Sequence, residues 1–174
     1  IPEFKGDTLV ALDGSGSMSG RPFDIGSLFA AALLKNNRTD FMGFSDRGVY
    51  KSVDTRLPVS AIQDFVVSNR VHGGTDFNSV FEAANKKYDR IVILTDEQGW
   101  IDNGRLSGSF RAYRERTGAT PKIFSFNLQS YGTMMFPEKD VYCMSGWSEK
   151  ALVLMGKLEE DRNVLVNTIK EVNI

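Results

Sequence analysis

The sequence predicts an α/β fold: a mostly parallel, doubly wound sheet of about six strands with one antiparallel edge strand, and helices on both faces. Three observations lead to this prediction. Short apolar runs alternate with segments of helical periodicity along most of the 174 residues. Residues 90–95 are almost entirely apolar, as expected for a strand covered on both faces. The stretch Ser45-Asp46-Arg47-Gly48 separates two β-like runs and is typical of a hairpin turn, which accounts for the antiparallel strand.

Each element follows from a local pattern. The predicted strands are residues 8–13, 40–44, 49–53, 90–95, 122–127 and 140–144. The predicted helices are residues 22–35, 60–68, 77–87, 104–117, 148–158 and 164–172. Pro22 suits a first helical turn, because proline lacks the N–H that a helix start leaves unpaired. Phe77, Val80, Phe81 and Ala84 recur at i, i+3, i+4 and i+7, the spacing of one buried helical face.

The composition indicates one ordinary globular domain over residues 1–174, because hydrophobic residues make up 41% and charged residues 25% of the chain. A net charge of −1 gives the protein no overall electrostatic attraction to nucleic acid or to an anionic membrane. The apolar runs are too short to span a bilayer, and no signal peptide pattern opens the sequence, so we expect no membrane association. The single cysteine, Cys143, excludes an intrachain disulfide and favours a reducing, cytoplasmic location.

Polar oxygens follow two of the predicted buried strands. The pentapeptide Asp-Gly-Ser-Gly-Ser at 13–17 leaves the first strand, and Asp96 follows the strand at 90–95. Thr75 lies in a Gly-Gly-Thr-Asp loop that precedes the helix expected at 77–87. Ligands of open α/β sheets bind beyond the carboxyl ends of the strands, so these groups share one edge if the two strands are neighbours. Hydroxyls and carboxylates suit Mg²⁺ or Mn²⁺. We therefore expect a metal site formed by Asp13, Ser15, Ser17, Thr75 and Asp96.

The order Asp-x-Ser-x-Ser, Gly-Gly-Thr-Asp and Leu-Thr-Asp resembles that of the von Willebrand factor A domain, over nearly the whole chain. In that family three such loops form a metal-ion-dependent adhesion site. The resemblance implies that Ser15, Ser17 and Thr75 hold the ion directly, while Asp13 and Asp96 act mainly through water or as supporting partners. An ion with few direct carboxylates would seek a carboxylate or other anion from a partner, either a protein or another ligand. We expect Asp76 to cap its helix instead of contacting the metal.

A narrower resemblance lies near the C-terminus. Residues 143–150 (CMSGWSEK) and 126–128 (FNL) resemble the corresponding turns of bacterial Ro (TROVE) proteins. Those proteins carry an N-terminal ring of helical repeats that binds non-coding RNA, followed by a von Willebrand-type domain. The resemblance implies that this chain is the C-terminal part of a longer ribonucleoprotein. Non-coding RNA would then bind mainly through an upstream region that this chain does not contain.

Other interpretations remain open. We expect no enzymatic activity, but a metal-dependent phosphohydrolase could use the same edge, with Glu97 as the extra carboxylate. An extracellular adhesion domain that binds an acidic partner is a third possibility. The arginines at 105, 111, 114 and 116 gather around one predicted helix and form either a solvated face or an RNA phosphate contact. His72, the only histidine, is expected to be an exposed loop residue.

Overall fold

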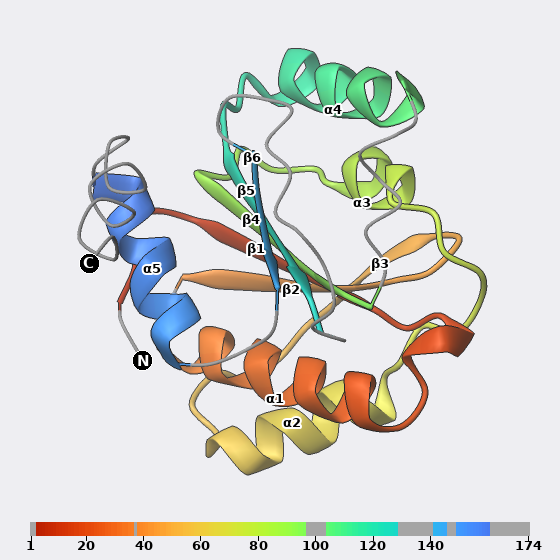
Figure 1. The fold of residues 1–174 in the computed structure, drawn as a ribbon, viewed down its shortest axis with the longest axis vertical. Coiled ribbons are helices and arrows are strands. Elements are labelled where there is room, and N and C mark those ends of the chain that lie inside the picture. Colours follow the sequence, from red (N-terminus) through yellow and green to blue (C-terminus); the bar gives the residue numbers. More distant parts are fainter. Residues whose placement is uncertain (1–2, 37, 97–103, 129–140, 146–148, 161–174) are drawn as a thin grey trace, which may run out of the picture.

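A computed structural model describes residues 3–36, 38–96, 104–128, 141–145 and 149–160 (Figure 1). In chain order the elements are β1 (Thr8–Asp13), the 3₁₀ helix η1 (Gly16–Met18), α1 (Arg21–Asn36), β2 (Thr39–Phe44), β3 (Gly48–Lys51), α2 (Val59–Ser68), α3 (Asn78–Ala83), β4 (Arg90–Thr95), α4 (Gly104–Thr117), β5 (Lys122–Asn127), β6 (Val141–Ser145) and α5 (Glu149–Glu160). The helix predicted at 164–172 lies outside the described residues. None of the described helices is both long enough and apolar enough to cross a membrane.

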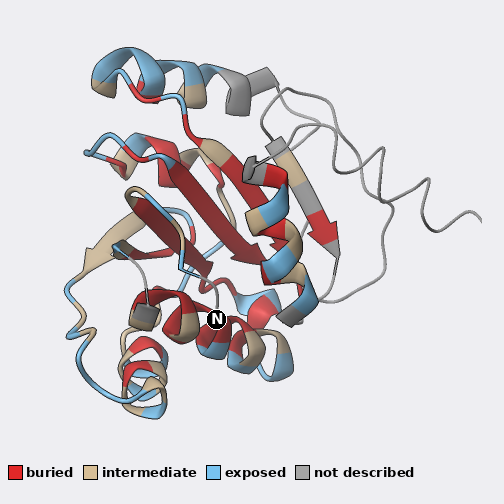
Figure 2. Cartoon of the chain, turned by 90° about the vertical axis from the view of Figure 1, so that its left-hand side faces the viewer, coloured by how far each residue is buried: buried red, intermediate tan, exposed pale blue. Residues whose placement is uncertain are grey.

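The strands form one six-stranded sheet in the order β3-β2-β1-β4-β5-β6. All neighbouring pairs are parallel except β2 and β3, which pair antiparallel at the edge. The predicted fold class is therefore confirmed. β1 and β4 are neighbours, in a register that pairs Thr8 with Arg90 and Leu12 with Leu94. Every residue of these two central strands is buried, and Figure 2 shows the middle of the sheet covered on both sides.

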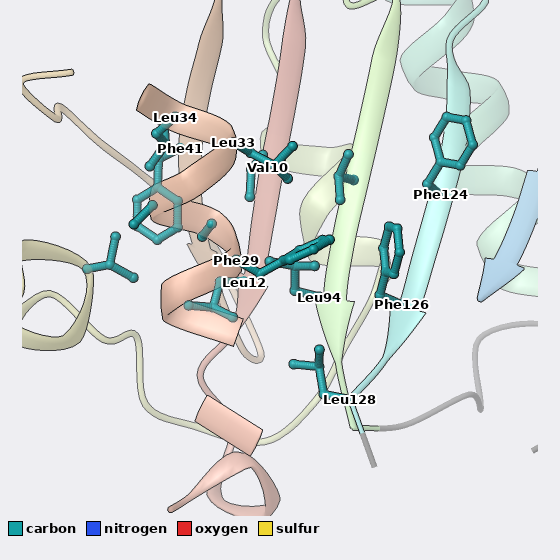
Figure 3. Packing of buried hydrophobic residues seen from close by; sticks show 14 of the residues in the cluster. Val10, Leu12, Phe29, Leu33, Leu34, Phe41, Leu94, Phe124, Phe126 and Leu128 are labelled. Atoms are coloured by element: carbon teal, nitrogen blue, oxygen red, sulfur yellow. The ribbon is translucent and has the colours of Figure 1, made fainter. Parts of the chain in front are cut away.

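Alternate residues of the central strands build two cores on opposite faces of the sheet. Val10 and Leu12 of β1 belong to a cluster with apolar side chains of α1, α2 and α5. Leu9 and Ala11 belong to a second cluster, with side chains of α3 and α4. Figure 1 shows α1, α2 and α5 on one side of the sheet and α3 and α4 on the other. In the first core α1 lies against the strands, with the ring centroids of Phe29 and Phe126 5.1 Å apart (Figure 3).

The helix α3 is shorter than predicted. It ends at Ala83 instead of residue 87. The backbone that follows forms hydrogen bonds with side chains of β3 and α4 instead of continuing the helix. The Asn85 N–H donates to Tyr50 Oη, and the Lys86 carbonyl accepts from Tyr113 Oη. These contacts, at 3.2 and 3.0 Å, are tertiary and replace the next turn of helix.

The start of α3 also differs by one residue from the prediction. The residue at the N-cap position is Phe77, and Asp76 precedes it. Asp76 nevertheless satisfies a free N–H of the helix start, because its Oδ1 accepts from the Asn78 backbone N–H at 3.0 Å. The same oxygen accepts from Asn78 Nδ2 at 2.8 Å.

Candidate metal site

The candidate site lies at the edge of the sheet where β1 and β4 end. Asp13 is the last residue of β1, and the next N–H, that of Gly14, donates to the Phe44 carbonyl of β2 at 2.8 Å. The chain then passes Ser15, which is buried, and enters η1, where Ser17 is exposed. The short loop therefore carries its side chains from the core to the surface within a few residues.

Asp13 joins the two central strands at this edge. Its side chain is fully buried, and its Oδ1 accepts from the Ser15 N–H at 2.8 Å. Its Oδ2 accepts from Thr95 Oγ1, on β4, also at 2.8 Å. Burial raises the pKa of Asp13, while the hydrogen bonds from Ser15 and Thr95 act in the opposite direction. Asp13 is thus placed to orient the loop and the end of β4 by hydrogen bonds.

The hydroxyls of the loop meet the carboxylate that follows β4. Ser15 Oγ and Ser17 Oγ lie 3.2 Å apart, and Ser17 Oγ donates to Asp96 Oδ1 at 3.0 Å. Adjacent oxygens around an octahedral Mg²⁺, each about 2.1 Å from the ion, are about 3 Å apart. The observed spacings fit that geometry. The structure therefore brings Asp13, Ser15, Ser17 and Asp96 together, from two strands whose pairing the sequence could only assume.

Thr75 belongs to a second loop that is fastened to the same end of the sheet. The Asp76 N–H donates to the carbonyl of Ser45, just beyond β2, at 2.8 Å. Ser45 Oγ in turn donates to the His72 carbonyl at 3.1 Å. Thr75 is half-buried, and within the described part of the chain its hydroxyl makes no hydrogen bond to the other four site residues.

The two glycines of this loop differ in their roles. A Cβ on Gly73 would come within 2.7 Å of Ser45 Oγ and 2.8 Å of Asp46 Oδ1, and its φ of +154° is one that side chains rarely adopt. A Cβ on Gly74 would meet nothing within 4 Å. The close approach of this loop to Ser45 and Asp46 therefore depends on Gly73. His72 is exposed, as expected, and it contributes its carbonyl to these contacts.

Arg70 and Thr95 support the site through hydrogen bonds, and neither is among the residues predicted to form it. Arg70 Nε donates to the Gly14 carbonyl at 2.9 Å, and its Nη2 donates to the Ser15 carbonyl at 2.6 Å. A charged residue just after a helix usually faces solvent, so Arg70 carried no signal of its own. Thr95 stands in the Leu-Thr-Asp motif, where its position before Asp96 was the only available signal.

The chemistry of this edge is dominated by hydroxyl oxygens. Within the described residues, no group of three or more histidine, cysteine, aspartate or glutamate side chains could hold a metal ion. A cation here would instead depend on serine and threonine hydroxyls, supported by two carboxylates. Such hard oxygen donors fit Mg²⁺ or Mn²⁺ better than softer transition metals. Glu97, considered as an extra carboxylate, lies outside the described residues.

A mostly parallel sheet with this loop order at its carboxyl edge defines the chain as a von Willebrand A-type domain. The family model described as the Ro60 vWA domain matches residues 8–158. The chain therefore belongs to the Ro60 vWA domain family, which confirms the resemblance noted in the sequence. In a comparison with curated proteins, none matches the chain.

Solved structures share the fold. The RO (RSR) protein of Deinococcus radiodurans superposes with a TM-score of 0.68 at 20% identity, covering 87% of this chain and 33% of that one. BatB from Bacteroides thetaiotaomicron gives 0.54 at 12% identity, covering 87% of this chain and 95% of that one. Proximal thread matrix protein 1 from the mussel byssus gives 0.53 at 14% identity, covering 86% and 44%. The chain thus spans about a third of the length of the Deinococcus protein.

Proposed function

We propose that this domain is a divalent-cation-binding interaction module. In this proposal Ser15, Ser17 and Thr75 hold Mg²⁺ or Mn²⁺, with Asp13 and Asp96 in support. The observation that carries the proposal is the spacing of three oxygens, with Ser15 and Ser17 Oγ 3.2 Å apart and Ser17 Oγ 3.0 Å from Asp96 Oδ1. The first of these spacings fits two adjacent ligand positions around one small cation, and the second fits Asp96 as the supporting carboxylate that orients the Ser17 hydroxyl.

The partner in this proposal supplies a carboxylate or another anion. Hydroxyls are neutral ligands, so an ion held mainly by them keeps most of its positive charge and favours an anionic ligand. Ser17 is exposed and Asp96 is half-buried, so this side of the site is accessible from solvent. A protein side chain or a small anion could therefore complete the coordination.

We propose no enzymatic activity for the domain. Hydrolysis would need a general base within hydrogen-bond reach of an attacking water. The two carboxylates of the site already accept hydrogen bonds, Asp13 from Ser15 and Thr95, and Asp96 from Ser17. These contacts suit them to orientation of the loops better than to proton transfer.

Calorimetric titration with Mg²⁺ and with Mn²⁺ tests the proposal. We expect saturable binding of one ion per chain, and strong weakening in Ser17→Ala, which removes one proposed ligand. Ser60→Ala is the matched control, because Ser60 is an exposed serine on α2, away from the site. A parent protein that binds neither ion would contradict the proposal. Metal-dependent turnover of a phosphate ester, lost in Ser17→Ala, would favour the phosphohydrolase alternative instead.

We further propose that the domain serves a cytoplasmic Ro-type ribonucleoprotein whose non-coding RNA binds mainly through a region outside this chain. Membership of the Ro60 vWA domain family supports this assignment. The arginines of α4 support only a weak contact from the domain itself. Arg111 and Arg114 are exposed beside a hollow of about 390 Å³, but Glu115 lines the same hollow. Arg116 donates to the carbonyls of Phe81 and Ala84 at the end of α3, and the side chain of Arg105 lies outside the described residues.

Titration of a structured RNA against this chain tests the division of roles. With about two phosphate contacts, counterion release predicts that affinity falls roughly tenfold between 50 and 200 mM salt. Replacing Arg111 and Arg114 together with alanine should flatten this dependence. Arg56→Ala is the control, since Arg56 is exposed and pairs with Asp54 at 2.8 Å. Tight, sequence-selective binding that resists salt would make this domain itself the principal RNA reader.

A further inference from the structure

We propose that Arg70 is the residue that positions the cation-binding loop, and that it links this loop to the one carrying Thr75. This inference rests on the proposed metal site. Arg70 lies two residues after Ser68, the last residue of α2, and two residues before His72, where the loop of residues 72–76 begins. It therefore stands, in the sequence, at the entrance to one loop while its side chain contacts the other.

The first argument is the clamp on a single peptide group. The Gly14 carbonyl accepts from Arg70 Nε at 2.9 Å, and the N–H of the same peptide unit, that of Ser15, donates to Asp13 Oδ1 at 2.8 Å. The peptide plane is thus held at both ends. Since this plane precedes Ser15, its orientation helps to fix the direction in which the Ser15 side chain leaves the backbone.

The second argument is that the guanidinium group of Arg70 donates hydrogen bonds to several acceptors of the loop at once. Arg70 Nη2 donates to the Ser15 carbonyl at 2.6 Å and to Ser19 Oγ at 3.1 Å, so one side chain contacts the loop on both sides of Ser17. The guanidinium carbon also lies 4.4 Å from the ring centroid of Phe23, on α1. Arginine presents several donors in one rigid plane, whereas lysine presents a compact ammonium that cannot match this set.

The third argument is the close contact of the two loops beside Arg70. A Cβ added to Gly14 would overlap the carbonyl oxygen of Val71 and lie 2.9 Å from its carbonyl carbon. The backbone after Arg70 therefore packs directly on the start of the cation-binding loop. Together, Arg70 and Val71 fasten the two loops that carry Ser15, Ser17 and Thr75.

Because Arg70 is positively charged, its electrostatic effect and its positioning effect on Mg²⁺ binding act in opposite directions. A guanidinium near a divalent cation repels it, so electrostatics alone predicts that removing the charge tightens Mg²⁺ binding. Positioning predicts the opposite, because loss of the clamp lets the ligand oxygens move apart. Arg70→Gln removes the charge, and Arg70→Lys keeps the charge but removes the planar set of donors.

The experiment measures the Mg²⁺ dissociation constant of each variant by calorimetry, together with its melting temperature without metal. We expect both substitutions to weaken Mg²⁺ binding by roughly tenfold or more, as is typical when a residue that orients metal ligands is lost. Arg56→Gln is the matched control and should bind like the parent, because Arg56 contacts Asp54. Ser19→Ala removes only one contact of Arg70 and should weaken binding less.

The possible outcomes distinguish failure of the role assigned to Arg70 from failure of the proposed metal site. A parent that does not bind Mg²⁺ would remove the site and the inference with it. A parent that binds, together with Arg70→Lys of unchanged affinity, would overturn the role of Arg70 alone, even if the melting temperature falls. Tighter binding by Arg70→Gln would also overturn it. If Arg70→Lys fails to fold, Ser19→Ala decides: weaker binding supports the inference, and parental affinity overturns it.

Discussion

Replacing Asp13 with alanine is expected to abolish the rise in melting temperature that Mg²⁺ gives to the parent protein. A ligand at 100 times its dissociation constant adds about 2.7 kcal/mol to the free energy of unfolding. For a domain of this size that corresponds to a shift of roughly 5–11 °C. The variant should lose the shift, because the Ser15 N–H and the Thr95 hydroxyl no longer share the carboxylate that orients them.

The same substitution should also lower the stability measured without metal. Asp13 is fully buried, so its removal takes away the acceptor of two hydrogen bonds, from the Ser15 N–H and the Thr95 hydroxyl, and removing a buried acceptor costs about 1–3 kcal/mol. Loss of a buried carboxylate offsets part of this cost. Thermal denaturation with and without Mg²⁺ separates the two effects. Asp64→Ala is the control, since Asp64 is exposed on α2, and it should keep the parental shift. An Asp13→Ala protein that responds to Mg²⁺ like the parent would contradict the site.

The second large effect is expected for Gly14→Ala. An alanine Cβ at this position would overlap the Val71 carbonyl, and this neighbour is backbone, which cannot rotate away. Overpacking of this kind costs about 1–3 kcal/mol. We also expect weaker Mg²⁺ binding, because the strain pushes apart the two loops that carry the proposed ligands. Denaturant unfolding and calorimetry measure the two effects.

Gly16→Ala is the matched control in the same loop. A Cβ on Gly16 would meet no heavy atom within 4 Å, so the change adds a methyl group without a clash. Its stability should stay within about 0.5 kcal/mol of the parent. If Gly14→Ala were as stable as Gly16→Ala, the close packing of Val71 on the loop would be wrong.

The central strands could be predicted from the sequence because burial on both faces leaves a simple apolar pattern. Residues 8–13 and 90–95 were predicted with the bounds that β1 and β4 have. The end of α3 could not be predicted, because it depends on Tyr50 and Tyr113, which bond to its following backbone from other elements. The hydrophobic periodicity of one segment contains no information about hydrogen bonds from side chains of other elements.

In the candidate site, too, some residues could be predicted from the sequence and others could not. The motif residues of the first loop and Asp96 could be chosen because they follow apolar strands, and the pairing of β1 with β4 brings them together. Arg70 could not be chosen, since its role depends on carbonyls more than fifty residues away along the chain, with separations of 56 and 55 residues. Every residue carries a backbone carbonyl, so the sequence does not show which carbonyls accept hydrogen bonds from a distant side chain.

The pairing of β1 with β4 has a consequence for the kinetics of folding. The contacts of Ser17 with Asp96 and of Asp13 with Thr95 span 79 and 82 residues, so they close a long loop of chain. Contacts of such length are costly to form early and depend on the sheet being assembled first. A cation bound by them would act on the native state after the rate-limiting step. It would slow unfolding and lengthen the lifetime of the folded domain, while the rate of folding would stay nearly unchanged.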